Sequence, residues 1–247
     1  MTNPTASILI IGDEILNGRT EDQHISFMSK RFALMGIALK EARVVGDDEV
    51  AIVAGVNALR SRYDYVFTTG GIGGTHDDVT AASIAKAFGV PLVRDAAIVK
   101  LLKDRYKDRL NEPGLRMADI PEGASLIPNA VTAAPGFMMG NVYVMAGVPS
   151  IMRAMFDAIE PTLSCGKPVI TKTIQTTLVE SVLAPHIEEV EVANDGIEVG
   201  SYPSFYDGKW SVSVVVRGFE EGLVDLAANQ ICEKFKALGD EPTLSNL

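Results

Sequence analysis

The sequence predicts an α/β protein, with a mostly parallel β-sheet covered by helices on both faces and a small α+β domain after it. Two patterns predict this fold class. From Ala6 to Leu163, short apolar runs alternate with helix-length segments, which is typical of a parallel sheet buried between two helical layers. After Cys165-Gly166-Lys167-Pro168 the order changes to β-α-β-β-α. We therefore expect two domains, residues 1–166 and 167–247.

The elements of the first domain follow from apolar spacing and from capping residues. The segment 22–35 has apolar residues at helical spacing and is followed by Gly36, which supplies a left-handed C-terminal cap. Asp48 and Asp95 can each cap the helix that follows them. In chain order we expect strand 6–11, helix 22–35, strand 37–45, a helix after residue 48, strand 65–69, helix 78–88, a strand at 90–93, a helix from 95 to about 110, an irregular stretch at 111–120, a hairpin near 137–145 and a helix at 149–163.

The second domain is expected to contain a strand at 169–177, a helix at 180–193 and a strand at 197–201. Asp207-Gly208 then predicts a hairpin turn. The next strand has alternating valines at Val212, Val214 and Val216, and a helix at 220–238 follows.

Composition limits the classes of function. Hydrophobic residues make up 47% and charged residues 22% of the 247 residues, which is an ordinary globular balance. No apolar run approaches the roughly 18 residues of a membrane span, and the N-terminus has no secretory signal. The net charge of −10 argues against nucleic-acid binding, which needs a basic surface. With two unpaired cysteines, Cys165 and Cys232, we expect a soluble cytoplasmic protein that binds neither nucleic acid nor membrane.

The strongest motif follows the expected strand at 65–69 and reads Thr69-Gly70-Gly71-Ile72-Gly73-Gly74-Thr75-His76-Asp77-Asp78. Its four glycines allow a sharp turn and the close approach of a ligand. Free amides of such a loop and of the next helix attract an anion at the carboxyl edge of the sheet. The loop fits neither the Walker nor the Rossmann pattern. It predicts a phosphate-bearing nucleotide or pterin, and we expect valine at Gly71 or Gly73 to abolish ligand binding while leaving the fold largely intact.

Carboxylates accompany the glycine loop. One of Asp77 and Asp78, or else Thr75, is expected to cap the following helix. Two adjacent acids would repel a phosphate unless a cation offsets them, and Mg²⁺ or a similar hard cation prefers carboxylate and phosphate oxygens. Further acids follow the first two strands, and in a parallel sheet those loops open on the same edge. Among them Glu14 is either a site residue or a solvated loop acid, and Asp47 is either a site residue or a helix cap.

At this point the motifs resemble a known family. Thr-Thr-Gly-Gly-x-Gly followed by Asp-Val-Thr is similar to the molybdopterin-binding fold of molybdenum-cofactor biosynthesis proteins. The fuller set resembles the competence/damage-inducible protein A (CinA) family still more closely, in order from residue 7 to about 163. The segments that carry this resemblance are Gly12-Asp13-Glu14-Ile15-Leu16-Asn17-Gly18, Asp22, Val45-Gly46-Asp47-Asp48, residues 70–80 and Ala146-Gly147-Val148-Pro149-Ser150-Ile151-Met152. Residues 168–247 resemble the small second domain of the same family.

The resemblance implies a metal-dependent pyrophosphatase that acts on ADP-ribose-like nucleotides, and the related domain of eukaryotic FAD synthase also points to dinucleotide hydrolysis. It assigns catalytic roles to Asp78 and Asp47 and the metal side to Glu14 and Asp77. A bound cation would polarise the phosphate bond and lower the pKa of an attacking water. The ligand or its phosphate would be held by Gly12, Thr69, Gly70, Gly71, Ile72, Gly73, Gly74, Thr75, Gly147 and Pro149.

The chain departs from the family pattern at several positions. Gly74 and Ala146 replace prolines, His24 stands where asparagine is usual, and Ile151 replaces a glutamate. The missing carboxylate at Ile151 puts catalysis in doubt, although binding could survive. We also expect the amidase domain of long family members to be absent after Leu247, together with the second domain that makes FAD in the eukaryotic enzyme.

Three functions remain open at this point. The first is hydrolysis of a nucleotide diphosphate linkage, the second is binding of molybdopterin or a nucleotide in molybdenum-cofactor metabolism, and the third is a non-catalytic regulatory role. The small domain of the family is likened to an RNA-binding KH module, but residues 168–247 have no G-x-x-G and include the acidic stretch Glu188-Glu189-Val190-Glu191. We therefore expect that domain to serve packing or homo-oligomer formation.

Overall fold

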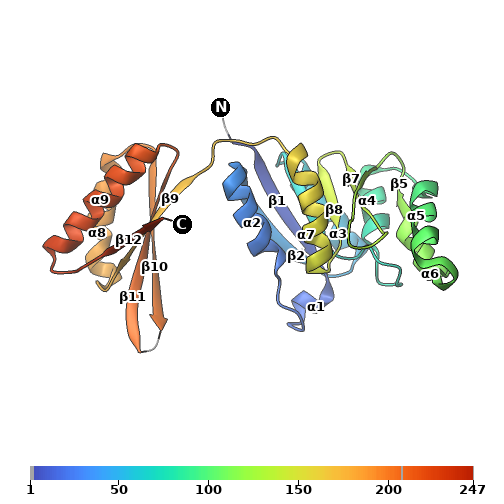
Figure 1. The fold of residues 1–247 in the computed structure, drawn as a ribbon, viewed down its shortest axis with the longest axis horizontal. Helices are drawn as coiled ribbons and strands as arrows, with labels where there is room; N and C mark the ends of the chain where they lie inside the picture. Colours follow the sequence, from blue (N-terminus) through green and yellow to red (C-terminus); the bar gives the residue numbers. More distant parts are fainter. Residues whose placement is uncertain (1–2, 207, 247) are drawn as a thin grey trace. The chain divides into compact units, whose positions relative to one another are not determined.

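The structure, a computed structural model, describes residues 3–206 and 208–246. Its contacts divide the chain into two compact units, Met1–Gly166 and Lys167–Leu247, and each is described by itself (Figure 1). Asp207, the first residue of the expected hairpin turn, lies outside the described residues.

Unit 1 is built on a six-stranded sheet with the order β2-β1-β3-β8-β7-β6. The four strands β2, β1, β3 and β8 run parallel, and β7 and β6 add two antiparallel strands at one edge. This sheet confirms the predicted fold class. The strands are β1 (Thr5–Ile11), β2 (Ala38–Val45), β3 (Tyr65–Thr69), β6 (Ser125–Ile127), β7 (Gly136–Met139) and β8 (Val142–Met145).

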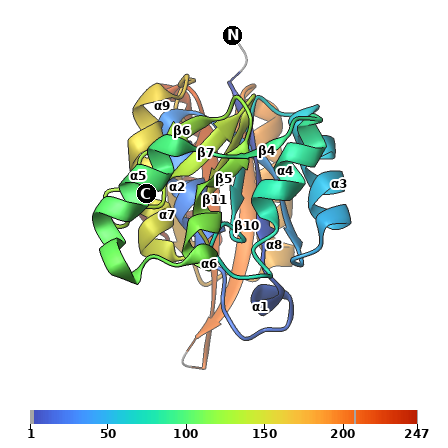
Figure 2. The ribbon, with the colours of Figure 1, turned by 90° about the vertical axis from the view of Figure 1, so that its right-hand side faces the viewer.

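Helices cover both faces of this sheet, as Figure 2 shows. Because side chains of a strand alternate between faces, Ile8 and Ile10 pack with α2 and α7 while Leu9 and Ile11 pack with α3 and α4. Each face has its own apolar core. The helices are α1 (Asp13–Leu16), α2 (His24–Met35), α3 (Glu49–Arg60), α4 (Thr80–Phe88), α5 (Ala96–Tyr106), α6 (Glu112–Leu115) and α7 (Pro149–Ile159).

Capping residues fix several of these helices where the sequence predicts. The Asp48 side chain accepts a hydrogen bond from the Ala51 amide at 2.8 Å, and Asp95 accepts one from the Ile98 amide at 2.9 Å. Gly36 ends α2 with φ of 66°. The cap of α3 is Asp48, and not its neighbour Asp47.

The stretch 111–120, expected to be irregular, contains regular secondary structure. It contains α6, a 3-10 turn at Arg116–Ala118 and the start of β5 (Asp119–Pro121), which pairs with β4 (Leu92–Arg94). The Asn111 side chain caps α6 by accepting from the Gly114 amide at 3.0 Å. The expectation was wrong because these elements are only three or four residues long, which is too short to show an apolar period.

Unit 2 is a four-stranded antiparallel sheet with the order β10-β11-β9-β12. Two helices pack against it, and Val212, Val214 and Val216 all point into the core, as their alternation predicts. The last strand was not expected from the sequence. The elements are β9 (Ile170–Thr176), α8 (Glu180–Ala193), β10 (Ile197–Tyr206), β11 (Lys209–Gly218), α9 (Glu221–Ala237) and β12 (Thr243–Asn246). Among the described helices of both units, none combines the length and apolar character that a membrane span requires.

Candidate functional site

The four parallel strands of unit 1 end at one edge of the sheet in matched register. Ile11 at the end of β1 is level with Val45 of β2, and Thr69 at the end of β3 is level with Met145 of β8. Backbone hydrogen bonds join neighbouring strands where these loops begin. The Gly12 amide donates to the Val45 carbonyl at 3.0 Å, and the Gly70 amide donates to the Met145 carbonyl at 3.1 Å. The edge therefore gathers four loops into one place.

The glycine loop is held against the sheet by its first two glycines. Gly70 and Gly71 have φ of 103° and 65°, which other residues adopt at a cost. A Cβ on Gly71 would lie 2.2 Å from the Thr80 hydroxyl oxygen, and that hydroxyl donates to the Gly70 carbonyl at 2.9 Å. The geometry at Gly71 therefore argues against the expectation that a larger residue leaves the fold intact. That expectation remains a prediction for Gly73, where a Cβ would meet only the Asp78 carboxylate, 2.5 Å away.

Three successive amides of this loop are unpaired. Among the described residues, the N–H groups of Gly71, Ile72 and Gly73 have no hydrogen-bond acceptor, whereas Gly70 and Thr80 on either side have theirs. Consecutive free amides that follow a left-handed turn form a concave donor group suited to an anion. This arrangement is the physical basis for a phosphate site at the loop.

Asp78 closes the loop and caps no helix. One of its carboxylate oxygens accepts hydrogen bonds from the Thr75 amide, at 2.9 Å, and from the Thr75 hydroxyl. Helix α4 begins later than expected, at Thr80, and Val79 before it gives no side-chain cap. The prediction that Asp77, Asp78 or Thr75 caps this helix is wrong, because the loop uses Thr75 and Asp78 to bond each other.

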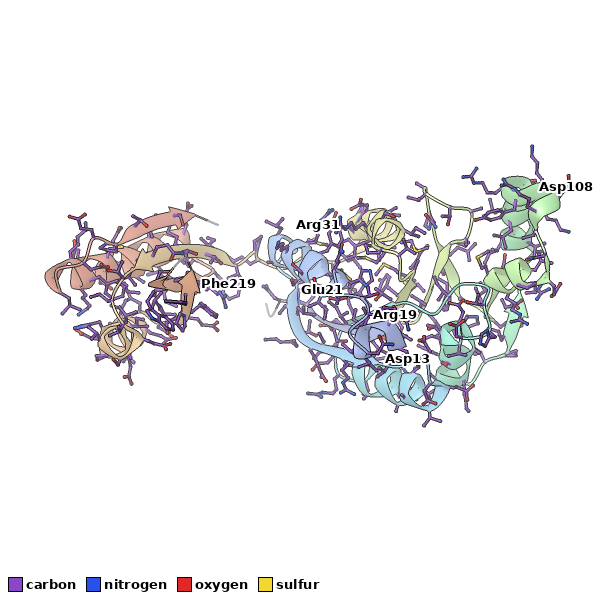
Figure 3. The ribbon with its side chains drawn as sticks, turned by 90° about the horizontal axis from the view of Figure 1, so that it is seen from below. Asp13, Arg19, Glu21, Arg31, Asp108 and Phe219 are labelled. Carbon is purple, nitrogen blue, oxygen red and sulfur yellow. The ribbon has the colours of Figure 1, made fainter. Side chains whose placement is uncertain are left out.

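The loops after β1 and β2 bring further carboxylates to the same edge. Asp47 accepts a hydrogen bond from the Asp13 amide at 2.9 Å, and Figure 3 shows Asp13 on α1. Burial raises the pKa of Asp47, and the neighbouring charges of Asp13, Glu14 and Asp77 raise it further. By contrast, hydrogen bonding within the loop lowers the pKa of Asp77. Several carboxylates thus gather at this edge, and the carboxyl group of Asp47 gives up its proton less readily than an ordinary aspartate.

Most of the predicted site residues line one cavity of about 490 Å³. The predicted site residues on its wall are Glu14, Asp47, Gly70, Gly71, Ile72, Gly73, Asp77, Asp78 and Gly147. The remaining five are elsewhere. Thr69 is buried at the end of β3, and Gly12 precedes α1 beneath the Glu14 carboxylate. Gly74 and Thr75 lie on the far part of the loop, and Pro149 is the first residue of α7.

Part of the cavity wall was missed by the sequence analysis. Tyr106 is the last residue of α5, and Met117, Asn129 and Thr132 come from the long segment between α5 and β7. One signal in the sequence could have indicated part of this wall, because an asparagine often forms a turn with its own backbone two residues on. The Asn129 side chain does so here and accepts hydrogen bonds from the Val131 and Thr132 amides.

His24, where asparagine is usual in the family pattern, lies behind the glycine loop. It is only 5% exposed, and its Nδ1 is 3.1 Å from the Thr69 hydroxyl and 3.5 Å from an Asp22 oxygen. Its Nε2 is buried and has no hydrogen-bond partner. Burial lowers the pKa of His24, so the ring is neutral at pH 7.

The acids on the cavity wall are Glu14, Asp47, Asp77 and Asp78, and their carboxylate oxygens are the kind of ligand that a hard cation such as Mg²⁺ prefers. Within residues 3–206 and 208–246, however, no three His, Cys, Asp or Glu side chains come together as ligands of a metal ion.

Comparison with known proteins places the chain in a family. Residues 7–164 match the family model described as a probable molybdopterin binding domain. The crystal structure of the protein CinA, of unknown function, from Thermoplasma acidophilum is 33% identical over 64% of this chain and 98% of that one, with a TM-score of 0.60. This chain belongs to the CinA-like family of molybdopterin-binding domain proteins. The resemblance inferred from the sequence motifs is confirmed.

Other relatives extend the match into unit 2. A protein of Archaeoglobus fulgidus is 33% identical over 227 residues, which are 88% of this chain and 97% of that protein. A CinA-like protein of Syntrophus aciditrophicus is 33% identical over 80% of this chain but only 50% of its own length. Residues 168–239 match the family model described as the middle domain of FAD synthase.

Proposed function

We propose that this CinA-like protein hydrolyses the diphosphate linkage of an ADP-ribose-like nucleotide in a reaction that depends on a divalent cation. The observation that carries the proposal is the shared cavity, which is lined by Glu14, Asp47, Asp77 and Asp78 together with the three loop residues whose amides are free. Amides bind a phosphate, and carboxylates bind the cation that a diphosphate brings with it.

The loop amides hold one phosphate of the substrate. Gly70 and Gly71 set the loop conformation, Thr80 fixes it to the helix, and the Asp78–Thr75 hydrogen bonds close its far end. Because these bonds exist within the protein itself, the donors need little rearrangement when the phosphate arrives.

Glu14 and Asp77 would hold the cation, with phosphate oxygens and water as the other ligands. Mg²⁺ is usually held in this way, by one or two carboxylates together with the phosphates of the substrate. Both carboxylates line the cavity in which the phosphates of the substrate would lie. When bound, the cation would neutralise charge on the phosphates and acidify a water molecule.

Asp47 is the proposed proton acceptor. Its raised pKa lies closer to neutral pH than that of an ordinary carboxylate, so Asp47 is the stronger base. In the reaction the oxygen of a water molecule bonds to one phosphorus and its proton passes to Asp47. The P–O bond to the bridging oxygen breaks, and the second phosphate leaves with that oxygen. Two phosphate monoesters result.

The test compares Asp78→Asn with Asp48→Asn in the full chain, using ADP-ribose and a panel of divalent metals. Asn can accept both Thr75 bonds at position 78, and it caps α3 about as well as Asp at position 48. Both variants should keep the wild-type melting temperature. Only Asp78→Asn should lose turnover, by about 100-fold to 10,000-fold, because it removes a carboxylate charge that we propose helps to position the cation. Equal turnover in the two variants would remove Asp78 from the reaction.

Ile151 favours a second candidate, the binding of molybdopterin or a nucleotide without turnover. Its side chain lines the cavity and packs against the core, at the position where the family pattern has a glutamate. Wild-type protein that binds such a ligand tightly, yet releases no phosphate monoester with any metal, would select this function.

A further inference from the structure

Residues 100–109, called the basic segment here, carry an excess of positive charge. They include five of the 22 Lys and Arg residues and two Asp, so the segment has a net charge of +3 in a chain whose net charge is −10. All five cations are exposed, and within the described part of the chain none of them has an ion pair or a side-chain hydrogen bond. They are Lys100, Lys103, Arg105, Lys107 and Arg109.

Stabilisation of helix α5 explains only part of this charge. Lys103 and Arg105 stand in the last turn of the helix, where cations interact favourably with the helix dipole. The effect falls off within one turn. It does not account for Lys100, which lies earlier in the helix, or for Arg109, which lies three residues beyond its end.

Lys107, directly after the helix, has a backbone conformation that suits glycine. Its φ is 50° and its ψ is −127°. It is the only residue other than glycine with a positive φ in the ranges 3–206 and 208–246. A glycine would make this turn without strain, and strained residues of this kind cluster at functional sites. The conformation therefore indicates a use for the lysine side chain that is separate from the turn.

The basic segment borders the candidate site. Tyr106, between Arg105 and Lys107, lines the cavity of about 490 Å³, and Figure 3 shows Asp108 at the periphery of unit 1. Four acids stand on the described wall of that cavity, whereas none of its residues is a lysine or an arginine. An anionic ligand therefore approaches an acidic cavity in an acidic protein, and the basic segment supplies positive charge beside its path.

We propose that the basic segment attracts the phosphate-bearing ligand towards the cavity and speeds its association. Charges near the entrance of a site act on a ligand before contact and raise its association rate, most strongly at low salt. The inference rests on the proposed function, because it takes a phosphate-bearing nucleotide as the ligand. The segment acts on association, while the glycine loop and the cation determine how fast the ligand leaves.

The test measures association and dissociation of the fluorescent nucleotide MANT-ADP by stopped flow, with the full chain, Mg²⁺ and a series of NaCl concentrations. Wild-type association should slow as salt rises, although the net charge of the protein is negative. At low salt the double variant Lys103→Gln/Arg109→Gln should associate about three- to tenfold more slowly than wild type, with dissociation unchanged. The two should converge near 1 M salt, where the Debye length is about 3 Å.

Lys30→Gln/Lys40→Gln is the matched control, because it changes the net charge by the same amount. Both lysines are exposed and neither lines the cavity. Lys30 lies on α2, and Lys40 lies near the start of β2, away from the carboxyl edge of the sheet. This variant should associate with MANT-ADP as fast as wild type.

Lys107→Gly separates the proposed role of the side chain from a role in the fold. Relief of the strained conformation should raise the melting temperature, whereas loss of the charge should slow association at low salt about twofold. A purely structural residue would not show these two opposite effects. Wild-type association in the Lys107→Gly protein would contradict the proposal at this residue.

Wild-type association that speeds up with salt, or equal association rates of the two double variants at low salt, would overturn the proposal. If MANT-ADP does not bind at all, the nucleotide site and the attraction towards it fail together. Absence of ADP-ribose turnover rejects only the hydrolysis, and slow association in Lys103→Gln/Arg109→Gln would still support the role of the basic segment.

Discussion

Replacing Gly71 with alanine tests whether the glycine loop is part of the fold as well as of the site. Two costs are expected. A positive φ costs an alanine about 1–2 kcal/mol relative to glycine. The new Cβ would also displace the Thr80 hydroxyl, 2.2 Å away, from the buried Gly70 carbonyl, and an unpaired buried carbonyl costs about 1–3 kcal/mol. Together these give a loss of about 2–5 kcal/mol in the free energy of unfolding.

Gly89 provides the matched control. It ends α4 with φ of 68°, and a Cβ there meets no atom within 4 Å. Gly89→Ala should therefore show the conformational cost alone, about 1–2 kcal/mol. The assay is urea unfolding followed by far-UV circular dichroism, because the single tryptophan, Trp210, lies in unit 2 and its fluorescence does not report directly on unit 1.

The difference between the two variants measures the contact with Thr80. If Gly71→Ala is no less stable than Gly89→Ala, the loop is not held by Thr80 and the reasoning fails. Ligand binding is better tested at Gly73, where φ is not positive and the new Cβ meets the Asp78 carboxylate. Gly73→Ala should weaken nucleotide binding with a smaller loss of stability than Gly71→Ala.

Two predictions follow from pKa shifts. The pKa of Asp47 is raised in the folded protein, so its ionisation destabilises the fold as pH rises from about 4 through the folded value. Asp47→Asn should therefore melt higher than wild type at pH 7, with a difference that shrinks below about pH 4, and an equal or lower melting temperature at pH 7 would contradict this. The pKa of His24 is lowered, so wild type should lose stability as pH falls below about 6.5. His24→Asn should lose less stability between about pH 7 and pH 5 in calorimetry, and identical pH dependence would refute the assignment.

The parallel sheet and the edge that carries the glycine loop and the acids were predicted from the sequence because each depends on local signals. Apolar runs such as 6–11 end in glycine, caps such as Asp48 and Asp95 mark helix starts, and parallel strands must bring their following loops together. The order of strands and acids along the chain was therefore enough to assign the carboxylates Glu14, Asp47, Asp77 and Asp78 to one edge.

The features that could not be predicted from the sequence depend on the loop conformation or on contacts between separate segments. The bond between Asp78 and Thr75 competes with helix capping, and only the loop conformation decides which forms. A cavity of about 200 Å³ beside the glycine loop needs α4, β4 and the 3-10 turn at Arg116–Ala118 to meet, although none of these segments has a recognisable motif. The pairing of β12 with β9 likewise joins residues far apart in the chain.

The loss of the family glutamate at Ile151 can now be related to the geometry. The apolar side chain packs on the core where it borders the cavity, so the site keeps its shape and loses one negative charge. Burial raises the pKa of Asp47, and the neighbouring charges of Asp13, Glu14 and Asp77 still raise it further. A cation at this edge therefore still meets a negative potential, but it has fewer protein ligands than the family pattern provides. Phosphate oxygens and water must supply the others. We accordingly expect divalent cations alone to bind weakly and to bind more tightly when a diphosphate is present.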